Sequence, residues 1–294
     1  MIYTIENELL KVSVTTYGAQ VCSVVRKCDG TEHIWQADKS VWGYHAPILF
    51  PYAGKLSQGK TTAKGVTWEN APQHGFARTM EHRFVRRNEN EIVLELTDNE
   101  ETYAKWPYHF RLESSFILEG DKLTHRLSVE NLDEEKMPFG IGYHPAFTIP
   151  FDDQHTCEDY EFRFDVPQSP ICIDCRPGGL ISGKNYYLHT NSDTIALHES
   201  LFANDSFCMT NLTAKTLGIY EKGTGRGVEC DISGFPYCLI WSKPQWPMPF
   251  VCIEPWMSLP SPEGGSTQWS EKPDAAILNP GQRWHCDLNT RFVR

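Results

Sequence analysis

Residues 110–131 read FRLESSFILEGDKLTHRLSVEN, and this stretch decides the fold class. Apolar residues recur at every second position on both sides of Gly120-Asp121. Side chains on a β-strand point alternately to opposite faces, so this pattern predicts two strands that each bury one face. A Gly-Asp pair between two such runs is typical of a hairpin turn. The stretch therefore predicts an antiparallel β-hairpin.

The same alternation recurs along the chain, bounded by Gly, Asn, Asp or Pro. It is found in LLKVSVTTYGAQVCSVVRK (9–27), EIVLELTD (91–98) and GVECDISGFPYCLIWSK (227–243). Amphipathic helices are nearly absent, and DNEETYAKWPYHF (98–110) has room for about one helical turn before Pro107. The 19 prolines and 21 glycines are spread along the chain and form no linker. We therefore expect residues 1–294 to form one all-β domain, a large twisted β-sandwich.

The composition narrows the class of function. The formal net charge of −11 leaves no general means of neutralising phosphates along a duplex, so nucleic acid is not an expected partner. The N-terminal residues show no basic start followed by a long apolar run, and no apolar window reaches the ~18 residues of a membrane helix. We therefore expect a cytoplasmic protein that acts on small molecules.

The ten cysteines lie mostly inside apolar runs, which predicts free thiols in a reducing compartment. CIDC (172–175) is the single CxxC motif in the sequence. One such pair, without a second pair or a nearby histidine pair, is a weak indication of zinc. We expect these residues to alternate along a strand instead, and we expect no metal.

Four segments break the strand pattern and place polar residues among aromatic and small ones. They are HAPILFPYAGKLSQGK (45–60), APQHGFARTMEHRF (71–84), FGIGYHPAF (139–147) and FVCIEPWMSLPSPEGG (250–265). In the last segment Glu254 ends an apolar run, which predicts a partly buried carboxylate. Burial raises the pKa of a carboxyl group and suits it to general-base chemistry near neutral pH. The alternative is a strand-end carboxylate in an ordinary salt bridge.

The other polar residues of these segments also have a structural and a functional interpretation. His144 is either a hydrogen-bonded core histidine or an acid–base group, and His74-Gly75 is either a turn or part of a site. Arg78 and Lys55 are solvated charges unless a ligand meets them. Tryptophans lie in or near the same segments, and Trp256 directly follows Glu254-Pro255. An indole face beside polar groups is a common way to bind a sugar, although most tryptophans are core residues.

Taken together, LFPYAGKL, PQHGFAR, GYHPAF and CIEPW, in this order in a β-rich chain, resemble the aldose 1-epimerase (galactose mutarotase-like) family, and within it the bacterial LacX-type branch. The similarity extends from TYGAQVCSV (16–24) to CIEPWMSLP (252–260). The resemblance implies a β-supersandwich with an open sugar-binding groove. It also implies interconversion of the α and β anomers of a free aldohexose such as galactose or glucose, without a cofactor.

The resemblance assigns roles to individual residues. His144 matches the general acid of the family, Glu254 its general base, and His74 a second histidine that binds the sugar. Lys55 stands where the family usually has an arginine that contacts sugar hydroxyls, and lysine lacks the planar fork of arginine. Asp205, in LFANDSFCM (201–209), is matched to an aspartate of the family groove. These roles give positioned acid and base groups on one sugar, which is what ring opening and closure require.

Three other interpretations stay open at this point. A hexose-6-phosphate mutarotase would use Arg78, helped by Lys55, to bind the phosphate, because an arginine fork matches phosphate geometry. A non-catalytic sugar-binding or sensor protein would need stacking rings and hydrogen bonds but no acid–base pair. A metal site made of His74, His144 and Glu254 would use ligand types that suit zinc or iron, but the sequence has no HxH or HxxxH spacing among them.

Overall fold

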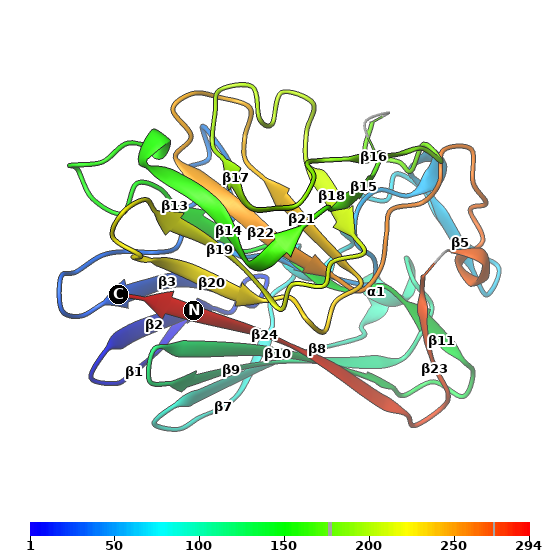
Figure 1. The fold of residues 1–294 in the computed structure, drawn as a ribbon. Coiled ribbons are helices and arrows are strands. Elements are labelled where there is room, and N and C mark those ends of the chain that lie inside the picture. The colour runs from blue at the N-terminus through cyan, green and yellow to red at the C-terminus, as the bar shows by residue number, and fades with distance from the viewer. Residues whose placement is uncertain (176–177, 273) are drawn as a thin grey trace.

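The computed structural model describes residues 1–175, 178–272 and 274–294, and most of its regular structure is antiparallel β-strand (Figure 1). Two large sheets form two layers. The first sheet has nine strands in the order β17 (Ser192–Ala196), β14 (Tyr160–Gln168), β19 (Thr216–Glu221), β20 (Gly227–Asp231), β24 (Arg283–Val293), β10 (Lys122–Asn131), β9 (Phe110–Glu119), β8 (Glu91–Thr97) and β7 (Arg83–Arg87).

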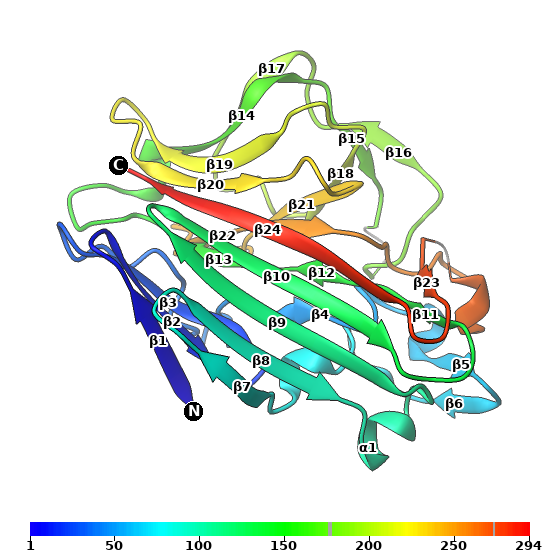
Figure 2. The same ribbon diagram turned by 90° about the horizontal axis from the view of Figure 1, so that it is seen from below.

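The second sheet lies behind the first in the view of Figure 2. Its eight strands follow the order β16 (Asn185–Tyr187), β15 (Ile171–Ile173), β18 (Phe207–Thr210), β21 (Tyr237–Trp241), β22 (Phe250–Trp256), β12 (Gly142–Tyr143) and β4 (Ile48–Leu49), with β13 (Ala146–Thr148) also paired to β22. The predicted all-β sandwich is therefore confirmed. The prediction that residues 1–294 form a single domain stays a prediction.

Smaller elements complete the described part of the chain. Three further sheets comprise β1 (Ile2–Glu6), β2 (Leu10–Thr15) and β3 (Gln20–Arg26); β5 (Thr61–Ala63) and β6 (Val66–Trp68); and β11 (Met137–Phe139) and β23 (Ala276–Leu278). The helical elements are α1 (Glu100–Tyr103) and the 3-10 turns η1 (Ser57–Gly59), η2 (Ala77–Thr79), η3 (Cys157–Asp159) and η4 (Trp269–Glu271). None of the helices in the described ranges has the length and apolar character that crossing a membrane requires.

The quoted stretch 110–131 forms the hairpin that its alternation predicts. Strands β9 and β10 pair in register on either side of Gly120-Asp121, with Leu118 opposite Leu123. On β9 the alternate residues Phe110, Leu112, Ser114, Phe116 and Leu118 are buried. The single helical turn expected before Pro107 is α1, which begins after the N-cap residue Asn99.

Strand β22 is buried on both faces, and its two faces have different neighbours. Val251 and Ile253 belong to the large hydrophobic core that also holds residues of β9 and β10, so they point between the two sheets. Phe250, Cys252 and Trp256 belong to smaller clusters on the opposite face. Because successive side chains alternate, Glu254 shares the face of Phe250, Cys252 and Trp256 and points away from the core. This alternation turns the carboxylate toward the site described below.

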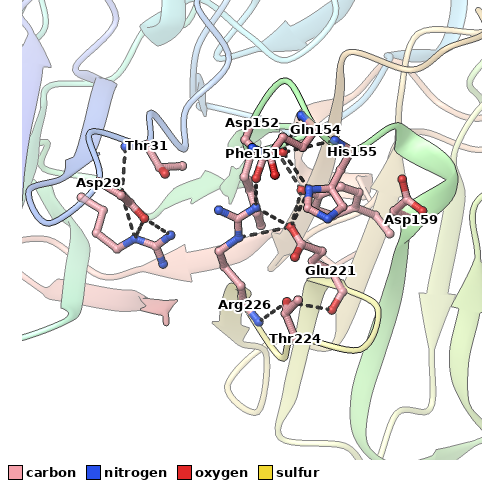
Figure 3. A network of polar contacts seen from close by, with 12 residues as sticks. Asp29, Thr31, Phe151, Asp152, Gln154, His155, Asp159, Glu221, Thr224 and Arg226 are labelled. Atoms are coloured by element: carbon pink, nitrogen blue, oxygen red, sulfur yellow. Dashed lines mark hydrogen bonds and ion pairs between the residues drawn. The ribbon is translucent and has the colours of Figure 1, made fainter.

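A partly buried ion-pair network ties the loop after β13 to the β19–β20 hairpin (Figure 3). Arg226 binds both Asp152 and Glu221, and Glu221 is only 2% exposed. His155 lies 2.7 Å from Asp152 through Nδ1, and Tyr160 donates a 3.0 Å hydrogen bond to Glu221. Asp152, His155 and Glu221 have the ligand types of a metal site. However, the Arg226 guanidinium already supplies the positive charge that both carboxylates require, so we interpret the network as structural.

Candidate active site

Strand pairing brings His144 and Glu254 together. Gly142 pairs with Trp256, and Ala146 pairs with Cys252, so His144 occupies the intermediate position opposite Glu254. The regular strand stops at His144-Pro145, where proline has no N–H to donate to the ladder. The GYHPA sequence therefore interrupts the strand at the residue that faces the carboxylate.

The imidazole and the carboxylate are in direct contact and buried. His144 Nε2 lies 3.2 Å from Glu254 Oε2, and the side chains are 8% and 2% exposed. Burial lowers the pKa of His144 to about 3, and the nearby charge of Arg78 acts in the same direction. Burial also raises the pKa of Glu254 well above its usual value; Asp205 adds to this shift and Trp256 opposes it. Since burial disfavours the charge on each partner, we expect the pair to hold one proton over a wide range of pH.

His74 is fixed in one orientation by the loop that precedes η1. Its Nδ1 accepts a 3.0 Å hydrogen bond from the Gly54 N–H, while its own backbone N–H donates to the Gly54 carbonyl. Burial lowers the pKa of His74 well below its usual value, so the ring is neutral. A neutral imidazole whose Nδ1 accepts a hydrogen bond carries its hydrogen on Nε2. His74 is therefore a donor, and its ring meets His144 edge-on at 5.5 Å between ring centres.

Arg78 supplies a positive charge to the same cavity. It lies on η2, and its guanidinium carbon is 4.7 Å from the centre of the Tyr44 ring, a cation–π contact. Its Nε is buried and has no hydrogen-bond partner, and no carboxylate of the described chain forms an ion pair with it. Burial lowers the pKa of Arg78, but the group stays charged. Arg78 is thus available to bind oxygens of a ligand.

Tryptophans form the apolar wall beside the polar pair. The Trp42 ring stacks on His144 with ring centres 5.0 Å apart and an angle of 25° between the planes. Trp241 meets His144 edge-on at 5.8 Å. Trp256 lies over Gly142, where an added Cβ would be 2.7 Å from the indole, so only glycine lets this ring lie so close to the backbone. Indole faces and polar groups thus converge on one space.

Together these residues line a cavity of about 300 Å³. The volume is at the lower end of the range for small-molecule sites and suits a ligand of about one sugar ring. Of the seven predicted site residues, the cavity brings together six: His74, Arg78, His144, Asp205, Glu254 and Trp256.

Lys55 lies at the margin of this space. It is exposed and is not among the residues that line the cavity, and its methylene groups pack beside Gly179, which does line it. Its charge contributes to the lowered pKa of His74, so its amino group is close enough to act on the site electrostatically.

Other lining residues were not singled out from the sequence as binding residues. Tyr44 and Asn204 belong to loops whose sequences carry no distinctive motif, whereas Gln73 lies in PQHGFAR and Cys175 ends CIDC. Asn204 could have been found as the neighbour of Asp205, and Tyr44 as part of an aromatic group with Trp42. Trp246, which lies in the sequence near Trp241, does not line the cavity.

Two findings bear on metal binding. The ligand atoms of His144, Cys252 and Glu254 lie within 4.8 Å of one another, whereas His74 belongs to neither of the candidate clusters of the described residues. Burial raises the pKa of Cys252 well above its usual value, so it is a thiol in the free protein. In the CIDC motif, Cys172 belongs to the large core and Cys175 packs on the opposite face of the sheet, so the two thiols do not form a zinc-binding pair.

Comparison with known proteins agrees with this arrangement. The family model for aldose 1-epimerases matches residues 1–290. The chain is 30% identical over 288 residues to the plasmid-encoded protein LacX of Lactococcus lactis, with 95% of each chain covered. A galactose mutarotase related enzyme from Lactobacillus acidophilus has a similar structure, with a TM-score of 0.90, 30% identity and coverage of 100% of this chain and 98% of that one. A galactose mutarotase-like protein from Lactobacillus casei gives a TM-score of 0.90 at 27% identity, with 99% of both chains covered. The chain belongs to the aldose 1-epimerase family, a family of isomerases.

Proposed function

We propose that this protein interconverts the α and β anomers of a free aldohexose such as galactose or glucose, with His144 and Glu254 as the proton-transfer pair. The observation that carries the proposal is the 3.2 Å contact between His144 Nε2 and Glu254 Oε2 in a cavity walled by indole rings. A protein that only binds a sugar has no need of a buried acid–base pair, whose desolvation is costly.

The proposed reaction needs two proton transfers on one sugar. The proton of the pair first passes from Glu254 to His144 across their 3.2 Å contact. Glu254 then removes the proton of the anomeric hydroxyl while His144 gives a proton to the ring oxygen, and the C1–O5 bond breaks to give the open-chain aldehyde. Rotation about C1–C2 presents the other face of the carbonyl. The ring oxygen then attacks C1, and both protons return as the two groups exchange roles. The steps balance with a single proton on the pair, and positioned groups of this kind contribute ~10²–10⁴-fold each.

The other residues of the cavity have binding roles in this proposal. His74 donates its Nε2–H to a sugar oxygen, and Asp205 accepts from a hydroxyl. Trp256 and the neighbouring indoles pack against the C–H face of the ring. Lys55, at the margin of the cavity, binds a sugar hydroxyl or a substituent that extends out of the cavity. This assignment predicts that loss of Trp256 or His74 raises KM more than loss of Lys55 does.

Polarimetry tests the proposal directly. Fresh α-D-galactose and α-D-glucose are followed with and without the purified protein, and the uncatalysed rate is subtracted. Acceleration supports an epimerase and ranks the two sugars. A sugar that binds in calorimetry without any acceleration would identify a binding or sensor protein instead.

The unpaired guanidinium of Arg78 favours a second candidate substrate, a hexose 6-phosphate. Charge-assisted hydrogen bonds are worth ~1.5–3 kcal/mol, so loss of an arginine–phosphate contact corresponds to roughly 10–150-fold in kcat/KM. If the substrate is phosphorylated, Arg78→Ala lowers kcat/KM for α-glucose 6-phosphate by that factor and has a much smaller effect for α-glucose. Equal losses on both sugars would exclude a phosphate-specific role for Arg78.

A further inference from the structure

One cysteine, Cys175, lines the cavity, a second, Cys208, is buried behind the cavity wall, and the proton-transfer chemistry uses neither. Cys208 on β18 pairs with Leu239 on β21, which pairs with Glu254 on β22. Residues directly opposite one another in a sheet point to the same face, so Cys208 faces the same side as Glu254, two strand spacings or about 9.5 Å away. Leu239, which lies between them, lines the cavity. Cys208 therefore lies at the edge of the cavity floor.

The second thiol, Cys175, packs against the apolar cluster that contains Cys208. Cys175 follows β15 by two residues, and β15 pairs with β18 so that Ile173 is opposite Cys208. The two thiols are close enough for each to shift the pKa of the other. Cys175 lines the cavity and is partly exposed, whereas Cys208 is 1% exposed. One thiol is thus accessible from the cavity, and the other is buried.

The surroundings of the two sulfurs differ in a way that suits an attacking and a resolving thiol. The neighbouring Cys208 thiol lowers the pKa of Cys175, which favours the thiolate that acts as the nucleophile. The same contact and burial raise the pKa of Cys208 well above its usual value. A partly exposed nucleophilic thiol in contact with a buried partner is the arrangement found at redox-sensitive cysteines.

We propose that Cys175 and Cys208 form a thiol–disulfide exchange site in the wall of the cavity, whose reactants are small disulfides of the type R–S–S–R. Cys175 attacks one sulfur of the reactant, the S–S bond breaks, and one R–SH leaves with a proton. Cys208 then gives up its proton and attacks the Cys175–S–S–R bond, which releases the second R–SH. The protein is oxidised by two electrons and the reactant is reduced by two, so atoms and electrons balance. The product is a Cys175–Cys208 disulfide that joins the loop after β15 to β18, beside Asp205.

The test uses the reduced full-length protein and 2-hydroxyethyl disulfide, a small uncharged probe. Products are mapped under non-reducing conditions by peptide mass spectrometry, with fragmentation that distinguishes Cys172 from Cys175. We expect the Cys175–Cys208 cross-link as the main product of the wild type. In Cys208→Ser, and in Cys208→Ala as a second variant, we expect the cross-link to be lost and a mixed disulfide to accumulate on Cys175.

Exposed Cys28 provides the matched control. Cys28→Ser should leave the yield of cross-link unchanged, whereas Cys175→Ser should abolish both the cross-link and any adduct on Cys208. A wild type that keeps a stable mixed disulfide on Cys175 without forming the cross-link would overturn the proposal. So would a wild type in which Cys28 reacts and neither Cys175 nor Cys208 does.

Discussion

Replacement of Gly75 by alanine tests whether the loop HGFAR (74–78) is held in place by close backbone contact with Phe50. Gly75 has φ of +70°, and an added Cβ would lie 2.2 Å from the Phe50 carbonyl oxygen and 2.5 Å from its carbon. The left-handed conformation costs an L-residue ~1–2 kcal/mol, and overpacking adds ~1–3 kcal/mol. Gly30 is a matched control, because its φ is +74° but no atom lies within 4 Å of the added Cβ. We therefore expect Gly75→Ala to lose ~2–5 kcal/mol of unfolding free energy and Gly30→Ala ~1–2 kcal/mol.

Urea unfolding followed by tryptophan fluorescence measures both losses, provided that the two variants and the wild type share one m-value. Since Gly75 directly follows His74, we also expect kcat/KM for mutarotation to fall in Gly75→Ala and to be unchanged in Gly30→Ala. Equal destabilisation by the two substitutions would refute the reasoning. It would mean that the Phe50 carbonyl moves away freely and that backbone contact does not fix the position of His74.

Two further predictions concern the acid–base pair and the network of Figure 3. The pair works with one proton, and the raised pKa of Glu254 keeps that proton bound. A second proton binds only when the pH falls close to the lowered pKa of His144, about 3. We therefore expect kcat/KM, after subtraction of the spontaneous rate, to show no acid limb as the pH falls from the ordinary histidine value of ~6.5 to about 5; an acid limb centred near ~6.5 would contradict this assignment. Arg226→Met leaves buried Glu221 and partly exposed Asp152 without their counter-charge and should cost ~1–3 kcal/mol in urea unfolding. Exposed Arg291, 3.8 Å from Asp121, is the control, and Arg291→Met should cost under ~0.5 kcal/mol; similar losses in both variants would rule out a special contribution of the network.

The hairpin and most of the longer strands could be predicted from the sequence because period-2 alternation is a local signal. The 110–131 stretch places its turn at Gly120-Asp121 without reference to any distant residue. The short strands of the second sheet, such as β12 and β4, have only two residues each and carry no such period. Strand β12 pairs with β22 and β4 pairs with β12, and in each case the two partners are distant in sequence.

The candidate site shows the same division between local and distant information. Motifs identified His144 and Glu254, but their contact follows from the register of β12 and β13 on β22, which no local pattern encodes. The hydrogen bond from Gly54 to His74 and the stacking of Trp42 on His144 likewise join segments that are far apart in sequence. The contact between Cys175 and Cys208 depends on the pairing of β15 with β18, so the sequence alone indicates only separate thiols.

The most direct test of the central claim is mutarotation of fresh α-D-galactose and α-D-glucose by wild type, Glu254→Gln and His144→Asn. Both substitutions keep the size of the side chain close to the original and remove its ability to exchange a proton near neutral pH. We predict that wild type accelerates at least one sugar and that each variant loses ~10²–10⁴-fold in kcat while it still binds that sugar in calorimetry. If wild type accelerates neither sugar, or if either variant keeps the wild-type rate, the His144–Glu254 pair does not carry out the proton transfers proposed for it.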